Sequence, residues 1–278
     1  MPPSFGSPQY WNNRFTSNPN PFEWLEPPNA LDFHLVSALN ESQDQNPQIL
    51  HIGCGTSLLS FHLRAHVNHS KQIHNVDYSD VAIEIGKKRE LEIFGPDHIL
   101  QYQENKHMRW SVVDLLSHTS LHFVCKPSSY SIIVDKSTSD SIACADDVYV
   151  TLPYPLSTSS PHAPFMSALS QSSEPIHPLH ILAIHLAFLT KPGGRWISLS
   201  YSQDRFPFLH LPPIPSLPDP GKLWWLESKY EIEVPEVTAK GRGGTAVHRP
   251  KVLHWVYVIL RTDVALSARD GLASAYLE

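Results

Sequence analysis

The sequence has little cysteine and no cysteine pairing pattern. Its 278 residues include 3 cysteines, and Cys54, Cys125 and Cys144 lie far apart, without the C-x-x-C spacing of many metal and redox sites. An odd number of isolated thiols does not build the disulfide framework of a small secreted protein. We therefore expect reduced thiols.

Long apolar runs are also missing. The best candidate for a membrane span, HILAIHLAFL at 180–189, is short and contains His180 and His185, whereas a spanning helix needs about 20 apolar residues. The first residues, MPPSFGSPQYW, lack the charged start and apolar stretch of a signal peptide. We expect no membrane association and a cytoplasmic protein, with the nucleus as the alternative.

An excess of positive charge is absent too. The chain has 21 basic and 27 acidic residues and a net charge of −6 at pH 7, so no overall positive field would attract nucleic acid. The basic loop KGRGGTAVHRPK at 240–251 is interpreted as a solvated hairpin tip rather than a nucleic-acid site. No nucleic-acid partner is predicted.

What the chain does have is an alternation of short strand-like and helical segments. Strands are predicted at 49–52, 73–77, 108–114, 130–135 and 195–201, and helices at 30–39, 57–67, 81–91 and 180–189. This alternation is typical of an α/β fold with a Rossmann-like, doubly wound, mostly parallel sheet, whose ligands bind at the carboxyl ends of the strands. Two further runs, 229–237 and 252–262, predict a terminal antiparallel hairpin.

The whole chain, 1–278, is predicted to form a single domain. Residues 1–30 would form an aromatic amino-terminal cap, 45–206 the cofactor-binding core, and 207–262 a proline-rich connector with the hairpin. Within the core, 150–178 is rich in proline and serine, which do not sustain a helix or a central strand. We interpret 150–178 as a surface insertion.

A glycine turn, HIGCGTS at 51–57, follows the first predicted strand. It contains Gly53 and Gly55, but Leu58 replaces the third glycine of the dinucleotide fingerprint G-x-G-x-x-G, which disfavours a nicotinamide enzyme. Asp77 ends the second strand about 20 residues later, where a carboxylate can accept the hydroxyls of an adenosine ribose. His51 precedes the turn in a buried strand and is expected to be hydrogen-bonded in the core.

Two more strand ends favour S-adenosylmethionine over a nicotinamide cofactor. Asp114 ends the third predicted strand, where an acid can take the adenine amino group in a methyltransferase sheet. Asp135 and Lys136 end the fourth strand, beside the expected reactive centre. This order of residues matches a class I S-adenosylmethionine-dependent methyltransferase.

The same residues occur within motifs of a known group. The chain contains, in order, YWNNRF (10–15), PFEW (21–24), GCGTS (53–57), VDYS (76–79), VVD (112–114) and DKSTSD (135–140). In these motifs it resembles the lysine methyltransferases related to those that modify elongation factor 1A. The segment KPGGRWISLS (191–200) is common to many class I methyltransferases.

The resemblance implies a set of cofactor contacts. Trp11, Phe15 and Trp24 would close over the cofactor and present their ring faces to the sulfonium charge, although the same rings could simply cover the core. Amides of the glycine turn, at the start of the next helix, would meet the methionine carboxylate. The residues expected to line the cofactor are Gly53, Gly55, Asp77, Tyr78, Asp114, Leu115 and Lys136.

The expected reaction needs little catalytic machinery. Methyl transfer is an in-line displacement that depends on positioning and desolvation. The amine of a lysine acceptor must be neutral to react, and a carboxylate that relays a proton can assist its deprotonation. Asp135 and Asp140 are the candidates for contacting the acceptor. The acceptor is expected to be a lysine of a protein, by resemblance a translation factor; a small-molecule methyltransferase and a non-catalytic binding module are the alternatives.

Histidines at helical spacing form one further cluster in the sequence. His62, His66 and His69, in HLRAHVNH, would share a helix face and could bind zinc. However, no glutamate follows His62 and no cysteine is near in sequence. We interpret these histidines as a solvated helix face and predict no metal.

Overall fold

A computed structural model describes residues 3–95, 107–154, 171–215, 217–235 and 251–268 of the chain. Its centre is a 7-stranded sheet with the order β3-β2-β1-β4-β5-β7-β6. The strands are β1 (Ile49–Ile52), β2 (Ile73–Asp77), β3 (Arg109–Val112), β4 (Tyr130–Lys136), β5 (Thr190–Ser200), β6 (Trp224–Glu233) and β7 (Leu253–Arg261).

Strand direction divides the sheet into two parts. The pairs β2–β3, β1–β2, β1–β4 and β4–β5 are parallel, whereas β7 pairs antiparallel with both β5 and β6. This confirms the predicted mostly parallel, doubly wound sheet and its terminal antiparallel hairpin. The strand order reverses between β1 and β4, which is where such sheets bind their ligands.

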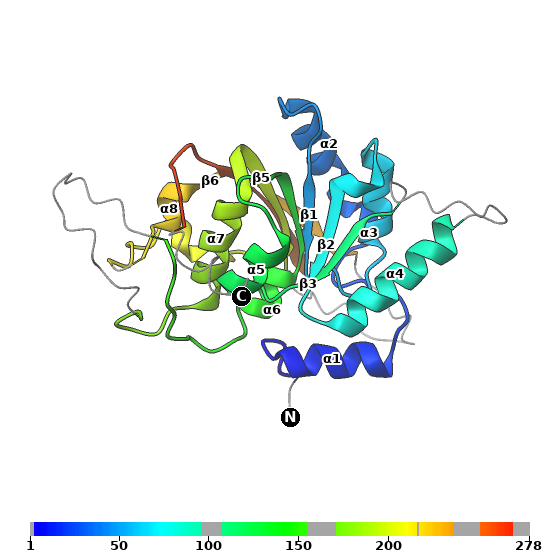
Figure 1. The fold of residues 1–278 in the computed structure, drawn as a ribbon, viewed down its shortest axis with the longest axis horizontal. Coiled ribbons are helices and arrows are strands. Elements are labelled where there is room, and N and C mark those ends of the chain that lie inside the picture. The colour runs from blue at the N-terminus through cyan, green and yellow to red at the C-terminus, as the bar shows by residue number, and fades with distance from the viewer. Residues whose placement is uncertain (1–2, 96–106, 155–170, 216, 236–250, 269–278) are drawn as a thin grey trace, which may run out of the picture.

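Helices cover both faces of the sheet (Figure 1). In Figure 1, α2, α3 and α4 lie on one side and α5, α6 and α7 on the other, while α1 runs below the edge where the parallel strands end. The helices are α1 (Pro8–Ser17), α2 (Asp32–Glu41), α3 (Leu59–His62), α4 (Asp80–Phe94), α5 (His118–Val124), α6 (Thr138–Ile142), α7 (Pro178–Leu189) and α8 (Pro220–Leu223), with 3₁₀ turns η1 (Pro28–Leu31), η2 (Leu63–His66), η3 (Ser70–Gln72) and η4 (Pro207–Leu209).

The pleat of the strands divides the core into two apolar clusters. On β1, Leu50 packs into the cluster that contains the buried α7, whereas Ile49 packs into the cluster that contains residues of α2 and α3. Alternate residues of a strand point to opposite faces of the sheet, so a strand covered on both faces is apolar throughout. This is why ILHI reads as a continuous buried run.

Some element boundaries differ from the predicted ones. The helix expected at 57–67 is divided into α3 and η2, the strand expected at 108–114 ends at Val112, and β6 starts at Trp224 rather than at 229. Helices α1, α5 and α6 were not predicted, because each is short and lacks a long apolar period. The hairpin loop at 236–250 lies outside the described residues.

The two ends of the proline- and serine-rich segment place several side chains in the core, although others, such as Thr151 and Glu174, are exposed. Leu152, Tyr154 and Ile176 have exposed fractions of 8%, 5% and 0% and belong to the core cluster around α7. Val148 also pairs with Ile176 across the segment. The expectation of a surface insertion is therefore wrong for these buried side chains, and 155–170 lies outside the described residues.

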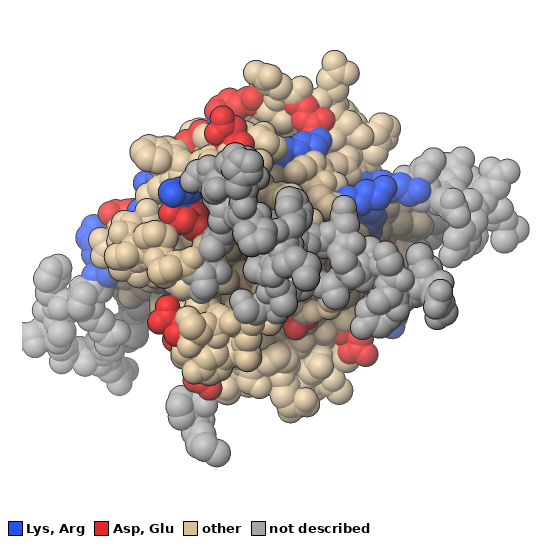
Figure 2. Space-filling view, turned by 60° about the vertical axis from the view of Figure 1, so that its left-hand side comes forward, with Lys and Arg blue, Asp and Glu red and all other residues tan. Residues whose placement is uncertain are grey.

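Surface charge and thiols complete the general picture. Basic and acidic side chains are interspersed over the face shown in Figure 2. The three cysteines are free, as expected, with Cys54 and Cys125 buried. Within the described ranges, no helix combines the length and the apolar character that crossing a membrane requires.

Candidate cofactor and acceptor site

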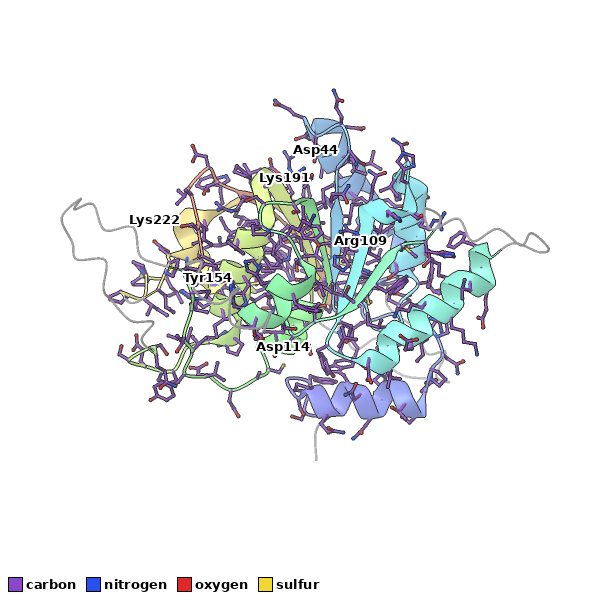
Figure 3. The ribbon with its side chains drawn as sticks, in the orientation of Figure 1. Asp44, Arg109, Asp114, Tyr154, Lys191 and Lys222 are labelled. Atoms are coloured by element: carbon purple, nitrogen blue, oxygen red, sulfur yellow. The ribbon has the colours of Figure 1, made fainter. Side chains whose placement is uncertain are left out.

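A cavity of about 570 Å³ lies at the carboxyl ends of the parallel strands. Figure 3 shows Asp114 at this edge, next to α1, whereas Asp44 and Lys191 lie at the opposite edge of the sheet. All residues that the resemblance assigned to the cofactor line this cavity: Trp11, Phe15, Trp24, Gly53, Gly55, Asp77, Tyr78, Asp114, Leu115 and Lys136. The structure thus brings them together, and their contact with a cofactor stays a prediction.

The glycine turn forms one wall of the cavity. Gly53 and Gly55 have φ angles of +54° and +48°, a left-handed conformation that glycine adopts without strain. A Cβ on Gly53 would lie 2.2 Å from Thr138 Oγ1, and that hydroxyl donates a hydrogen bond to the carbonyl of Ile52. Gly53 is therefore required by its conformation and by the close approach of α6.

Asp77 is held at the end of β2 by two backbone amides. Its carboxylate accepts hydrogen bonds from Gly55 N–H at 2.8 Å and Ser79 N–H at 2.9 Å. Burial of this side chain, which is 4% exposed, raises the pKa of Asp77 to about 6, although the amides favour the ionised form. Asp77 is thus ionised at neutral pH and available as a hydrogen-bond acceptor in the cavity wall.

Glu23, which the sequence reasoning did not select, joins the amino-terminal cap to the glycine turn. Its Oε1 accepts a hydrogen bond from Leu58 N–H at 2.6 Å, and its Oε2 accepts one from Ser57 Oγ at 2.8 Å. Oε2 also forms an ion pair with Lys136 Nζ. The sequence signal that could have identified Glu23 is the position of this acidic residue inside the aromatic motif PFEW.

This arrangement limits the backbone amides that are free to bind a ligand. The amide of Leu58, which follows the glycine turn at the start of α3, is bound by Glu23, and contact of the turn amides with the methionine carboxylate stays a prediction. Helix α3 is also only 4 residues long, so its aligned dipoles are few. Burial lowers the pKa of Lys136, and the neighbouring Glu23 carboxylate partly opposes this effect.

Aromatic rings of the cap close the cavity from the side of α1. Trp11 stacks on Phe15 with ring centroids 5.9 Å apart, and Trp24 meets Trp11 edge-on at the same distance. Trp11 Nε1 donates a hydrogen bond to Ser141 Oγ at 2.9 Å on α6, and the Tyr78 hydroxyl donates one to the carbonyl of Pro8. The cap is therefore attached to both sides of the cavity.

Asp135 does not face the cavity. It is fully buried, is absent from the cavity wall, and accepts hydrogen bonds on both carboxylate oxygens. The donors are Thr138 N–H, Ser139 N–H, Ser139 Oγ, Trp196 Nε1 and Ser198 Oγ. The expectation that Asp135 contacts the acceptor is wrong, because five donors surround its carboxylate inside the core.

Asp140, the other candidate, does line the cavity. Its Oδ1 forms an ion pair with Arg205 Nε at 2.7 Å and accepts a hydrogen bond from Ser200 Oγ, while Oδ2 accepts one from Tyr201 N–H at 3.2 Å. Tyr201 lies on the same wall and is 49% exposed. Tyr201 was not predicted, because a tyrosine after a strand has no distinctive sequence signal.

The histidines before and after the turn behave differently from one another. His51 is 1% exposed and its Nδ1 lies within hydrogen-bonding distance of Ser60 Oγ and Asn75 Oδ1, which confirms the expected core hydrogen bonding. The solvated helix face expected for His62, His66 and His69 is wrong for the first two, whose side chains are 30% and 16% exposed and approach Asp32. His69 is exposed, as expected, but lies outside the helical segment.

Comparison with known proteins places this geometry among methyltransferases. Methyltransferase srdJ of Neurospora crassa is 33% identical over 212 residues, which are 76% of this chain and 72% of that protein. EEF1A lysine methyltransferase 4 of Mus musculus is 26% identical over 206 residues, 73% of this chain and 64% of that protein. The solved N-methyltransferase NodS of Bradyrhizobium japonicum, in complex with S-adenosylhomocysteine, shares the fold with a TM-score of 0.51 at 11% identity, over 91% of this chain and 97% of that one. No family model matches the sequence.

Proposed function

Because the chain belongs to the class I S-adenosylmethionine-dependent methyltransferases, we propose that it methylates the side-chain amine of a lysine in a protein. S-adenosylmethionine is its methyl donor, and the described residues fit that group. The cavity combines apolar and aromatic walls with a buried carboxylate, Asp77, suited to a ribose. The carboxylate of Glu23 compensates the positive charge of Lys136. This lysine therefore does not repel the positively charged sulfonium.

Each part of the cavity wall has a role in this proposal. Asp77 accepts hydrogen bonds from the ribose hydroxyls, and Asp114, whose Oδ1 also accepts the amide of Leu116, takes the adenine amino group. Trp11, Phe15 and Trp24 exclude water. S-adenosylmethionine supplies an electrophilic methyl group when bound, so positioning and desolvation by these residues provide most of the rate.

Asp140 is the proposed contact for the acceptor amine. Arg205 and Ser200 occupy Oδ1, which leaves Oδ2, with a single amide partner at 3.2 Å, able to accept a further N–H from a ligand in the cavity. A carboxylate in this position orients the amine and favours its approach. The proposal for Asp135 is not retained.

The ordered motifs from YWNNRF to DKSTSD are the reason for proposing a protein lysine as the methyl acceptor. They are shared with the lysine methyltransferase group, and a mouse protein named as an EEF1A lysine methyltransferase is among the relatives. This chain spans 64% of that relative. Elongation factor 1A is therefore the first acceptor to test.

The test is incubation of the purified chain with S-adenosylmethionine labelled in its methyl group and with either elongation factor 1A or a cell lysate. We expect label on a lysine of a protein, identified by mass spectrometry of its peptides. Asp140→Asn should lower the rate roughly 100-fold with cofactor binding retained, whereas Asp204→Asn, at an exposed carboxylate, should not change it.

Other outcomes would replace the proposal. Label found only on a metabolite would identify a small-molecule methyltransferase. Cofactor binding without transfer, together with stable co-purification of another protein, would identify a binding module.

A further inference from the structure

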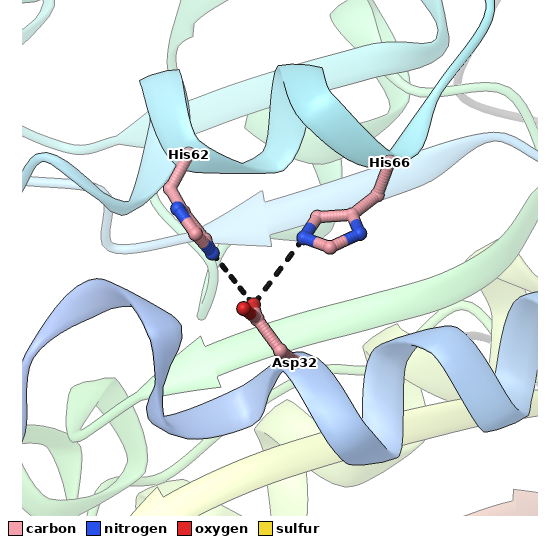
Figure 4. Close-up of side chains that lie close together, drawn as sticks. All are labelled: Asp32, His62 and His66. Atoms are coloured by element: carbon pink, nitrogen blue, oxygen red, sulfur yellow. Dashed lines mark hydrogen bonds and ion pairs between the residues drawn. The ribbon is translucent and has the colours of Figure 1, made fainter.

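Three side chains with metal-binding atoms meet between α2 and the helical segment that follows the glycine turn in the chain. Asp32 is the first residue of α2, His62 the last of α3 and His66 the last of η2. Their nearest ligand atoms all lie within 4.8 Å of one another. Figure 4 shows both imidazole rings directed at the Asp32 carboxylate from the neighbouring helical segment.

The two histidines compete for one oxygen. His62 Nε2 lies 2.6 Å from Asp32 Oδ1 and forms a hydrogen bond with it, while His66 Nε2 lies 3.3 Å from the same atom. His66 Nε2 is sealed from solvent and makes no hydrogen bond. A buried ring nitrogen without a hydrogen-bond partner is unfavourable, and a bound cation between the rings would give that nitrogen a partner.

We propose that Asp32, His62 and His66 bind a divalent transition-metal ion of the zinc type. Imidazole nitrogen together with carboxylate oxygen is a ligand set that suits Zn²⁺, whereas Mg²⁺ and Ca²⁺ prefer sites made of oxygen alone. In a tetrahedral site with bonds of about 2.0–2.1 Å, neighbouring ligand atoms are about 3.3 Å apart.

The spacing between His66 and Asp32 already has that value, 3.3 Å, whereas the 2.6 Å spacing between His62 and Asp32 has to widen. The ligand atoms of the two histidines lie within 4.8 Å of each other, so metal binding would also adjust their spacing. The side chains of His62 and Asp32 are 30% and 37% exposed, so a rotation of either side chain can provide this. Binding would release a proton if His62 Nε2 carries one, because a metal ligand must present a free lone pair. The same exposure leaves a fourth position open to water.

This metal would act on the fold rather than on methyl transfer. None of its three ligands lines the cavity, so the metal would join α2 to α3 and η2. Helix α3 starts immediately after the turn and after Leu58, whose amide is bound by Glu23. A metal here would therefore stabilise the segment that holds the glycine turn, independently of which acceptor the enzyme uses.

The experiment is calorimetric titration of chelator-treated protein with Zn²⁺, supported by the visible spectrum with Co²⁺. We expect a single tight site in the wild type, with a tetrahedral Co²⁺ spectrum and a higher melting temperature when metal is added. His66→Ala should lower the affinity for Zn²⁺ by more than about 100-fold. The loss of a residue that only orients a ligand lowers metal affinity by roughly 10- to 100-fold.

Two further variants make the test decisive. Asp32→Asn, which is nearly isosteric and can still accept a hydrogen bond from His62, should also lose the site, so that loss of folding in His66→Ala does not obscure the result. His69→Ala is the matched control, because His69 lies outside the cluster, and it should bind normally. No tight binding in the wild type, or equal binding in all variants through other members of the 17 histidines, would overturn the site.

Discussion

The aspartates near the carboxyl edge of the sheet are surrounded by different groups. Asp135 is enclosed by donors from the start of α6 and from β5, Asp140 is paired with Arg205, and Asp77 is held by two backbone amides. The surroundings of a carboxylate decide its charge and its free lone pairs. Asp135 therefore acts as a structural acceptor, whereas contact with a ligand is the role that we propose for Asp77 and Asp140.

Cofactor affinity should depend on pH through Asp77. The pKa of this buried carboxyl is about 6, and its ionised form is the better acceptor for ribose hydroxyls. We expect the affinity for S-adenosylhomocysteine to fall about tenfold for each pH unit below about 6, measured by calorimetry. His51 does not interfere, since burial lowers its pKa to about 4.

The control is Asp77→Asn, whose weaker binding should be flat over the same pH range. An unchanged pH profile in that variant would show that another group is responsible. Stability should move in the opposite direction to binding. The folded pKa lies above the ordinary value of 3.8, so the contribution of Asp77 to stability is present below that value and is lost as pH rises to about 6.

At the scale of elements, the amino-terminal cap is fastened to the sheet by a few long-range contacts. Glu23 binds the start of α3 and pairs with Lys136 at the end of β4. Arg89 of α4 donates hydrogen bonds to the carbonyls of Thr56 and Pro19. The cap, the glycine turn and β4 therefore form one connected wall, and a change in the cap should be felt at the cofactor.

Glu23→Ala should destabilise the protein and weaken cofactor binding. It leaves the Lys136 side chain, which is 4% exposed, without its ion-pair partner and the amide of Leu58 without its acceptor, at a cost of about 1–3 kcal/mol in the free energy of unfolding. Chemical denaturation and calorimetry measure the two effects. Glu233→Ala, which removes an exposed carboxylate of an ion pair on β6, is the control.

The ion pair itself can be isolated with a double variant. Glu23→Ala combined with Lys136→Met should be more stable than Glu23→Ala alone, because the second change removes the unpaired buried cation. If the double variant were less stable by the sum of both single effects, the two side chains would not be energetically coupled.

At the scale of the whole molecule, β4 and β5 connect the other parallel strands to the antiparallel part of the sheet, which starts at β7. Asp135 of β4 accepts hydrogen bonds from Trp196 and Ser198 of β5. Trp196 in turn packs edge-on against Trp224 of β6, with ring centroids 5.6 Å apart. Asp135 is therefore the polar centre of this contact.

Asp135→Ala should accordingly lower stability rather than act on the acceptor. It would leave several buried donors without an acceptor, and we expect the free energy of unfolding to fall by at least about 3 kcal/mol. Cofactor affinity, measured where the variant is folded, should change little. Asp204→Ala is the control on the surface. A stable variant that had lost only turnover would restore Asp135 as an acceptor contact.

Much of the fold and of the cavity wall follows from local sequence. The apolar runs of β1, β2 and β4 and the glycines of the turn express backbone and burial preferences that operate within a few residues. The motif residues line one cavity because parallel strands end at the same edge of the sheet. His51 was likewise predictable, since a polar side chain in a buried strand requires a hydrogen-bond partner.

What only the tertiary structure decided concerns contacts between distant residues. Glu23 and Lys136 are 113 positions apart in the sequence, and Asp32 and His62 are 30 positions apart. A local sequence pattern therefore predicts neither pair. Asp135 and Asp140 lie in the same motif, yet the packing of β5 and α6 buries the first and leaves the second on the cavity wall. Sequence alone determined which residues come to the edge of the sheet, because that depends on where each strand ends along the chain and on local preference. Their roles depend on neighbours that the chain supplies only once it is folded.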